Sequence, residues 1–88
     1  KYDGASGAID VSHNVTSVSD AGTGDHTVTI ATDFSGADWC AIDAARNAGA
    51  GRDHRVETMA AGTLRLLSSD GTNPEDSTYE CVVGFGDQ

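Results

Sequence analysis

The sequence predicts an all-β chain, a small antiparallel β-sandwich of the jelly-roll type with six to seven strands. Short runs rich in β-branched residues recur along the 88 residues, and clusters of Gly, Asp and Ser separate them. Short strands at this spacing are typical of sandwiches and barrels. The length suits a single domain, so we expect residues 1–88 to form one β domain with a small core.

The first elements are predicted from the alternation of apolar and polar residues and from the point where that alternation is interrupted. Residues 2–7 suit a turn or the end of a strand, and Ile9 and Val11 alternate with polar residues as in a strand with one buried face. Val15 and Val18 are three positions apart, which breaks strict alternation. We therefore expect a bulge or a bend between them.

The clearest hairpin turns through residues 20–25. Gly22 and Gly24 can take the positive φ angles that a tight connection requires. In the strand that follows, Val28 and Ile30 alternate with threonines, so we expect both to face the core.

The nearly continuous apolar run 39–42 predicts a central strand. Four alanines in residues 41–48 favour a helix on propensity alone, but a strand fits the rhythm of the neighbouring segments better. We interpret Trp39, at the strand start, as a core residue. The alternative is an exposed ring that stacks on a sugar.

The second half predicts another hairpin and a closing strand. Residues 55–59 and 63–67 flank a short Gly-containing turn, and a polar loop with the only proline covers residues 68–77. The closing strand is predicted from an alternating apolar set, which comprises Tyr79, Cys81, Val83 and Phe85.

The charge balance excludes several kinds of partner. Five Lys and Arg residues oppose fourteen Asp and Glu residues, a net charge of −9, which disfavours nucleic acid and anionic membranes. No run approaches the roughly 18 apolar residues of a spanning helix. We therefore expect a soluble chain with no nucleic-acid partner and no membrane insertion. Because it begins with Lys1, we expect it to belong to a longer or processed protein.

The sequence contains no recognisable catalytic or cofactor-binding pattern. Cys40 and Cys81 suit two small buried thiols in strands, with a single disulfide as the alternative. No Cys-x-x-Cys or His-x-x-x-His spacing supports zinc. His13, His26 and His54 are dispersed and support no catalytic triad. We expect neither an enzyme nor a bound cofactor.

The loop acids Asp70, Glu75 and Asp76, with Asn73, offer oxygen ligands of the kind that Ca²⁺ prefers. Their spacing is not that of an EF-hand, so a solvated loop is the favoured interpretation and no metal is expected.

The segment 46–55 concentrates three of the five basic residues of this acidic chain. Arginine can bind phosphate or carboxylate through two parallel hydrogen bonds, which suits an anionic group on a glycan. The alternative is that these arginines pair with acids of a neighbouring subunit. The candidate receptor-binding residues are Arg46, Arg52, His54 and Arg55.

Several stretches resemble a known family. Residues 14–20, NVTSVSD, followed by GTGDHTVTI at 22–30, are similar to a motif in the C-terminal domains of tailed-phage tail fibres and related virion appendages, especially those of marine phages. Residues 33–41 take the place of the phrase that follows this motif in the family. Residues 1–4 and 79–88 resemble the family's opening and closing strands. Together these stretches cover well over half of the chain.

The resemblance implies a virion structural protein, assembled in the host cytoplasm, in which this chain is the C-terminal knob or another module of a longer fibre. It implies a homotrimer that contacts other virion proteins and attaches to the host surface, with a surface glycan as candidate receptor. Receptor contacts would fall in the loops that depart from the pattern, above all 46–54. Two alternatives stay open. One is a head fibre or decoration protein without receptor binding, and the other is a carbohydrate-binding β-sandwich module of a secreted protein.

Overall fold

The computed structural model describes residues 1–46 and 53–88 and confirms the predicted β-sandwich. Its described strands form two antiparallel sheets, one of three strands and one of four. The strands are β1 (Tyr2–Asp3), β2 (Val15–Gly22), β3 (Asp25–Ile30), β4 (Cys40–Arg46), β5 (Asp53–Met59), β6 (Thr63–Ser69) and β7 (Tyr79–Phe85).

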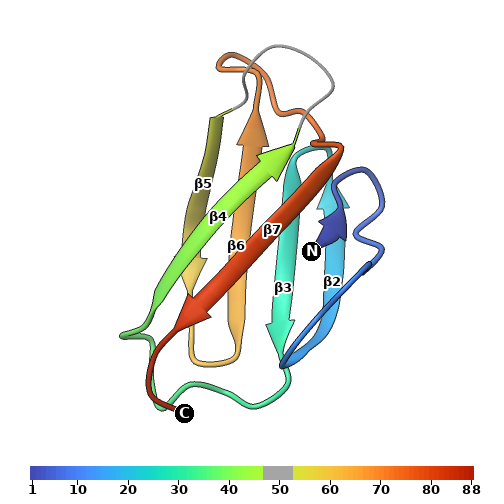
Figure 1. Cartoon of the computed structure of the whole chain (residues 1–88). Coiled ribbons are helices and arrows are strands. Elements are labelled where there is room, and N and C mark those ends of the chain that lie inside the picture. Colours follow the sequence, from blue (N-terminus) through green and yellow to red (C-terminus); the bar gives the residue numbers. More distant parts are fainter. Residues whose placement is uncertain (47–52) are drawn as a thin grey trace.

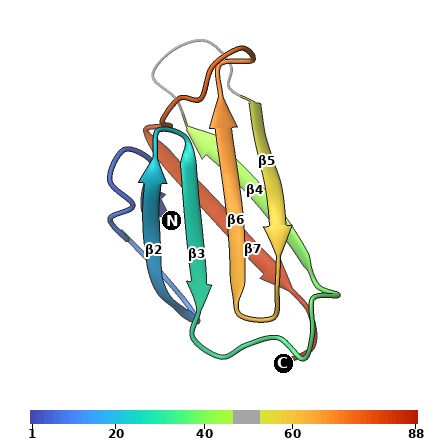
Figure 2. The ribbon, with the colours of Figure 1, turned by 180° about the vertical axis from the view of Figure 1, so that it is seen from behind.

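The two sheets cross at an angle. One has the strand order β1-β7-β4 and the other the order β2-β3-β6-β5. β4 and β7 run diagonally over the four-stranded sheet (Figure 1). The opposite view shows β2, β3, β6 and β5 side by side in front of them (Figure 2). Within the described residues, no helix is long and apolar enough to cross a membrane.

Both predicted hairpins are present, as β2–β3 and β5–β6. The irregularity expected near the start of β2 is a register shift between Val15 and Ser17. The β2–β3 turn uses Gly24 at a φ of 67°, and a Cβ there would lie 2.3 Å from the backbone oxygen of Ser68. This turn therefore requires glycine both for its backbone angle and for its contact with the end of β6.

The apolar core lies between the sheets, toward the end where β4 begins. Val28, Leu64 and Leu66 point inward from β3 and β6 and are buried. The Trp39 ring stacks on Phe34 with ring centroids 4.3 Å apart, and its indole N–H donates a 3.0 Å hydrogen bond to the carbonyl of Ala60. The prediction that Trp39 is a core residue is confirmed, and its ring is not exposed for stacking on a sugar.

The predicted strand at Ile9 and Val11 is wrong. Ile9 makes one isolated bridge to Tyr2, and both apolar side chains are exposed. The backbone N–H groups of Asp10 and Val11 donate instead to the carbonyl of Lys1, at 3.0 and 3.3 Å. The segment thus runs beside residues 1–3 through a few isolated backbone hydrogen bonds and does not extend into a regular strand of either sheet.

β4 is a strand, as expected, but not a central one. It lies at the edge of the three-stranded sheet and pairs with β7 alone within that sheet. Cys40 and Cys81 are free and exposed, which contradicts the prediction of buried thiols. Their Cα partners across the β4–β7 ladder are Phe85 and Ala44, so the two cysteines are not opposite each other.

The alternating apolar residues of β7 face outward, and the residues between them face the other sheet. Glu80 and Val82 point inward, and Gly84 lies so close to Trp39 that a Cβ there would be 2.7 Å from the ring. A larger inward residue at that position would displace the stacked aromatic pair.

Candidate functional site

Three ionisable side chains meet between the sheets, at the end of the sandwich away from Trp39. Asp43 comes from β4, Glu80 from β7 and His54 from the start of β5. Alternation turns all three inward: Asp43 lies between Ala41 and Ala45 on the inner side of β4. Small neighbours on the same face leave the carboxylate room to face β5 and β7.

The three groups are close together and nearly sealed from water. The Nδ1 atom of His54 lies 3.8 Å from Asp43 Oδ2 and 3.9 Å from Glu80 Oε1. The exposed fractions of the side chains are 14% for His54, 6% for Asp43 and 1% for Glu80. Within the described residues, neither nitrogen of His54 makes a hydrogen bond, and the Asp43 carboxylate has only the poorly aligned backbone N–H of the adjacent Ala44 as a donor.

Tyr2 holds one side of this cluster. Its hydroxyl donates a short hydrogen bond to Glu80 Oε2, which leaves Oε1 facing His54. The Tyr2 ring also contacts buried His26, at 5.2 Å between ring centroids. The short β1 strand therefore sets the orientation of the Glu80 carboxylate through one contact.

Burial dominates the electrostatics of the cluster. Loss of solvent raises the pKa of Asp43 to about 6, with the negative charge of Glu80 acting in the same direction and His54 opposing it. Burial, followed by the hydrogen bond to Glu80, likewise raises the pKa of Tyr2. Two carboxylates that approach each other in such a setting favour a proton or a cation between them.

The sequence pattern does not predict this cluster, although the chain contains a signal for it. Asp43 and Glu80 each interrupt an otherwise apolar strand, and His54 was assigned to a surface loop. Because β5 belongs to the other sheet, only the packing of the two sheets brings His54 to the carboxylates.

The predicted receptor-binding residues do not gather into one patch among the described residues. Arg46 lies on the outer side of β4 and Arg55 on the outer side of β5, where its Nε is 3.1 Å from Glu57. His54 points into the sandwich. Arg52 lies outside the described residues. Receptor binding by this set stays a prediction.

Two acids of the 70–76 loop accept hydrogen bonds from backbone N–H groups, one of them from within the loop and the other from outside it. Asp70 Oδ1 accepts from the backbone N–H groups of Thr72 and Asn73 at 2.8 and 2.7 Å. Asp76 Oδ1 accepts from the N–H of Gly24 at 2.6 Å. Among the described residues, the structure does not bring these acids together as a group of metal ligands.

The outer side of the β4–β7 pair is apolar. Three of its side chains are more than half exposed: Ile42 at 61%, Val83 at 53% and Phe85 at 57%. Cross-strand register places Cys40 beside Phe85, Ile42 beside Val83 and Ala44 beside Cys81. We call this surface the outer β4–β7 face, and it comprises Cys40, Ile42, Ala44, Cys81, Val83 and Phe85.

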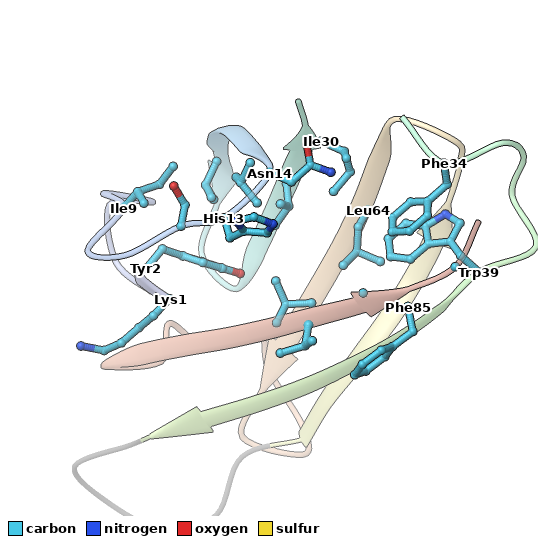
Figure 3. Close-up of a pocket in the computed structure, with 18 of the residues that line it drawn as sticks. Lys1, Tyr2, Ile9, His13, Asn14, Ile30, Phe34, Trp39, Leu64 and Phe85 are labelled. Atoms are coloured by element: carbon cyan, nitrogen blue, oxygen red, sulfur yellow. The ribbon is translucent and has the colours of Figure 1, made fainter. Parts of the chain in front are cut away.

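A groove of about 530 Å³ opens between β7 and the chain that leads into β2, and Val83 and Phe85 of the outer β4–β7 face are among the residues that line it. Figure 3 shows Tyr2 and His13 toward one end of the groove and Phe34 and Trp39 toward the other. β1 pairs only with the first two residues of β7, so the groove follows the part of β7 beyond Glu80. Its walls are mainly apolar, with Lys1, Tyr2 and His13 among the polar residues that line it.

Comparison with family models, with curated proteins and with solved structures found no match to this chain. The fold and the site geometry are therefore known from this structure alone, and the resemblance to phage fibres remains an expectation.

Proposed function

We propose that this chain is a non-catalytic assembly and attachment domain of a phage virion appendage, in which three copies associate through the outer β4–β7 face. The resemblance of residues 14–30 to tail-fibre domains supports the virion role and the number of copies. One structural observation carries the self-association: a regular sheet face of apolar side chains exposed to water.

The composition of that face supports burial against protein. Its three large side chains, Ile42, Val83 and Phe85, are half or more exposed in a single copy. Contiguous apolar patches on soluble proteins mark interaction sites, because burying them removes apolar surface from water. The stabilisation is about 25 cal/mol for each Å² that association buries.

The charge of the chain favours this face over others for contact between copies. At a net charge of −9, most pairings of identical surfaces bring acids together. The six residues of the outer β4–β7 face carry no formal charge, and the basic Arg46 continues β4 at one end. Identical copies can approach there without repulsion between acids within the contact.

Sedimentation velocity at micromolar concentration tests the association. We expect a trimer for the wild type and a monomer for Val83→Glu, because three buried carboxylates in one interface repel and lose solvation. Val11→Glu is the control for an added charge: Val11 is the same residue type and is more exposed, at 69% against 53%, but it lies outside β4 and β7, although it lines the same groove as Val83. A monomeric wild type, or dissociation by Val11→Glu as well, would contradict the proposal.

Attachment is proposed to run through the end of the sandwich that carries Arg46 and Arg55. Replacing Arg46, Arg52 and Arg55 together with Ser should lower adsorption of particles to host cells at least tenfold. Arg65→Ser is the control, because Arg65 is a half-exposed arginine on the outer side of β6. Unchanged adsorption by a triple variant that remains trimeric would favour the decoration-protein alternative.

A further inference from the structure

We infer that Asp43, His54 and Glu80 form a binding site for one divalent transition-metal ion of the Zn²⁺ class, placed between the two sheets. The inference is independent of the proposed virion role. It rests on the convergence of three ligand groups from three strands, and on buried ligand atoms that have no well-aligned hydrogen-bond partner among the described residues.

The donor set suits this class of metal. Imidazole nitrogen and carboxylate oxygen are both common zinc ligands, whereas Ca²⁺ prefers six to eight oxygens. One His and two carboxylates supply three protein ligands and leave further positions for water. A Zn²⁺ site of this kind needs no cysteine, so the free Cys40 and Cys81 on the outer surface are not required.

The spacing is close to that of a metal shell. Metal–ligand bonds of about 2.1 Å at tetrahedral angles separate two ligand atoms by about 3.4 Å. The two distances from His54 Nδ1 to the carboxylates are 3.8 and 3.9 Å, and one ligand atom from each of the three residues lies within 4.8 Å of the others. Small rotations of the Asp43 and His54 side chains, which no well-aligned hydrogen bond among the described residues restrains, bring the atoms to that spacing.

Burial is the second, independent observation. The Asp43 side chain is more than nine-tenths buried, yet its oxygens have no well-aligned hydrogen-bond donor among the described residues, only the backbone N–H of the adjacent Ala44. Glu80 is also buried, and its Oε1 is likewise without a hydrogen bond, on the side that faces His54. Buried polar atoms are nearly always paired, so these oxygens indicate a cation that belongs between them.

Tyr2 has the role of an outer partner in this site. Its hydroxyl donates to Glu80 Oε2 and so fixes the carboxylate with Oε1 directed at the shared space. Hydrogen bonds of this kind orient metal ligands and hold them in place before the ion arrives. A bound ion would join β4 and β7 of one sheet to β5 of the other.

Thermal unfolding with Zn²⁺ and with EDTA tests the site, in a Cys40→Ser, Cys81→Ser background that removes thiol ligands. We expect Zn²⁺ at 100 times its Kd to raise Tm by on the order of 10 °C, and Ca²⁺ at the same concentration to raise it far less. No rise with Zn²⁺ would overturn the inference.

Single variants locate the ion. Asp43→Asn and His54→Gln should each abolish most of the rise, while Asp38→Asn and His13→Gln, at exposed positions, should keep it. In EDTA at neutral pH, Asp43→Asn should have a higher Tm than the parent, because it removes one of two buried charges. An undiminished rise in the two cluster variants would place the ion elsewhere and overturn the inference.

Discussion

The two sheets of the sandwich place most of their large apolar residues on opposite sides. In the four-stranded sheet, Val28, Leu64 and Leu66 point into the core, and the pair formed by Arg65 and Asp25 lies outside. In β4 and β7 large apolar side chains face water, while two acids, Asp43 and Glu80, face the interior beside Ala41 and Val82. The four-stranded sheet has an apolar inner face, interrupted by the unpaired imidazoles of His26 and His54, whereas the three-stranded sheet has unmatched groups on both of its faces.

This difference explains why the proposed interface and two of the three proposed metal ligands, Asp43 and Glu80, belong to the three-stranded sheet, while the third ligand, His54, comes from β5 of the other. An exposed apolar face is stabilised by a partner that covers it, and buried acids are stabilised by a cation. The four-stranded sheet supplies the stability that allows β4 and β7 to keep these unfavourable groups. Functional residues are often placed at such locally unfavourable positions.

The largest expected effect compares the inner side of β6 with the outer side of β7. Leu66→Ala should lower the free energy of unfolding by about 2–5 kcal/mol, because it opens a cavity among buried side chains. Val83→Ala should cost less than about 1 kcal/mol in the monomer, since half of that side chain is already exposed. Urea unfolding at a concentration low enough to keep the protein monomeric measures both.

If Leu66→Ala and Val83→Ala lowered the free energy of unfolding equally, the proposed difference between the two sheets would be wrong. It would then follow that the outer β4–β7 face is covered within a single copy. Leu66→Met is a suitable second variant where the alanine variant fails to fold, because it keeps most of the volume.

The next effect concerns the turn that fastens the four-stranded sheet to the connection into β7. Gly24→Ala should cost about 2 kcal/mol or more, because it combines a positive φ with a Cβ placed against the backbone of Ser68 and Glu75. Gly22→Ala is the matched control: its φ of 142° is also unfavourable, but nothing lies within 4 Å of the added atom. If Gly24→Ala and Gly22→Ala lower the melting temperature equally, the close approach of Gly24 to Ser68 does not contribute to stability.

A smaller effect is expected from pH. The pKa of Asp43, about 6 in the folded chain, exceeds its value near 3.9 in the unfolded chain, so the folded state binds a proton more tightly. The free energy of unfolding should therefore fall by about 1–2 kcal/mol, allowing for solvent screening, between pH 4.5 and 7. The surrounding ionisable groups are Glu80, His54 and Tyr2.

Urea unfolding in EDTA at pH 4.5, 6 and 7.5 measures this decline. Asp43→Asn should flatten it, whereas Asp38→Asn, at an exposed position, should leave it in place. A free energy of unfolding that instead rises steadily across this range in the parent would show that Asp43 is not held in an unfavourable environment.

The sequence allowed the hairpins to be predicted but not the polarity of the sheets. Gly22 and Gly24 mark their turn by local chemistry, and Trp39 is core on general grounds of burial. Alternation on β7 separates Val83 from Glu80, but it does not say which of the two faces the other sheet. That choice depends on long-range packing, here on the contact of Gly84 with the aromatic pair.

The candidate metal site could not be predicted for the same reason. Asp43, His54 and Glu80 are far apart in the sequence, on strands of two sheets, and none of their spacings matches a local metal motif. The sequence contains only an indirect indication of the site, namely acids within apolar strands, and alternation alone predicts that such acids face solvent. The receptor set, which rested on local charge, is divided by the structure between the outer and inner sides of its strands.

The smallest expected effect sharpens the contrast between the two outer faces. Arg65 donates two hydrogen bonds to Asp25, from Nε at 2.9 Å and from Nη2 at 2.7 Å, and both side chains are partly solvated. Arg65 thereby lowers the pKa of Asp25, so the benefit of the pair is present at neutral pH and is lost as pH falls below about 4. Because solvent and salt screen an exposed pair, Asp25→Asn should lower Tm by no more than about 5 °C at pH 7, and by less in 1 M salt. It should also leave the sedimentation of the assembly unchanged, in contrast to a charge placed at Val83. Dissociation caused by Asp25→Asn would move the contact between copies to the outer side of the four-stranded sheet.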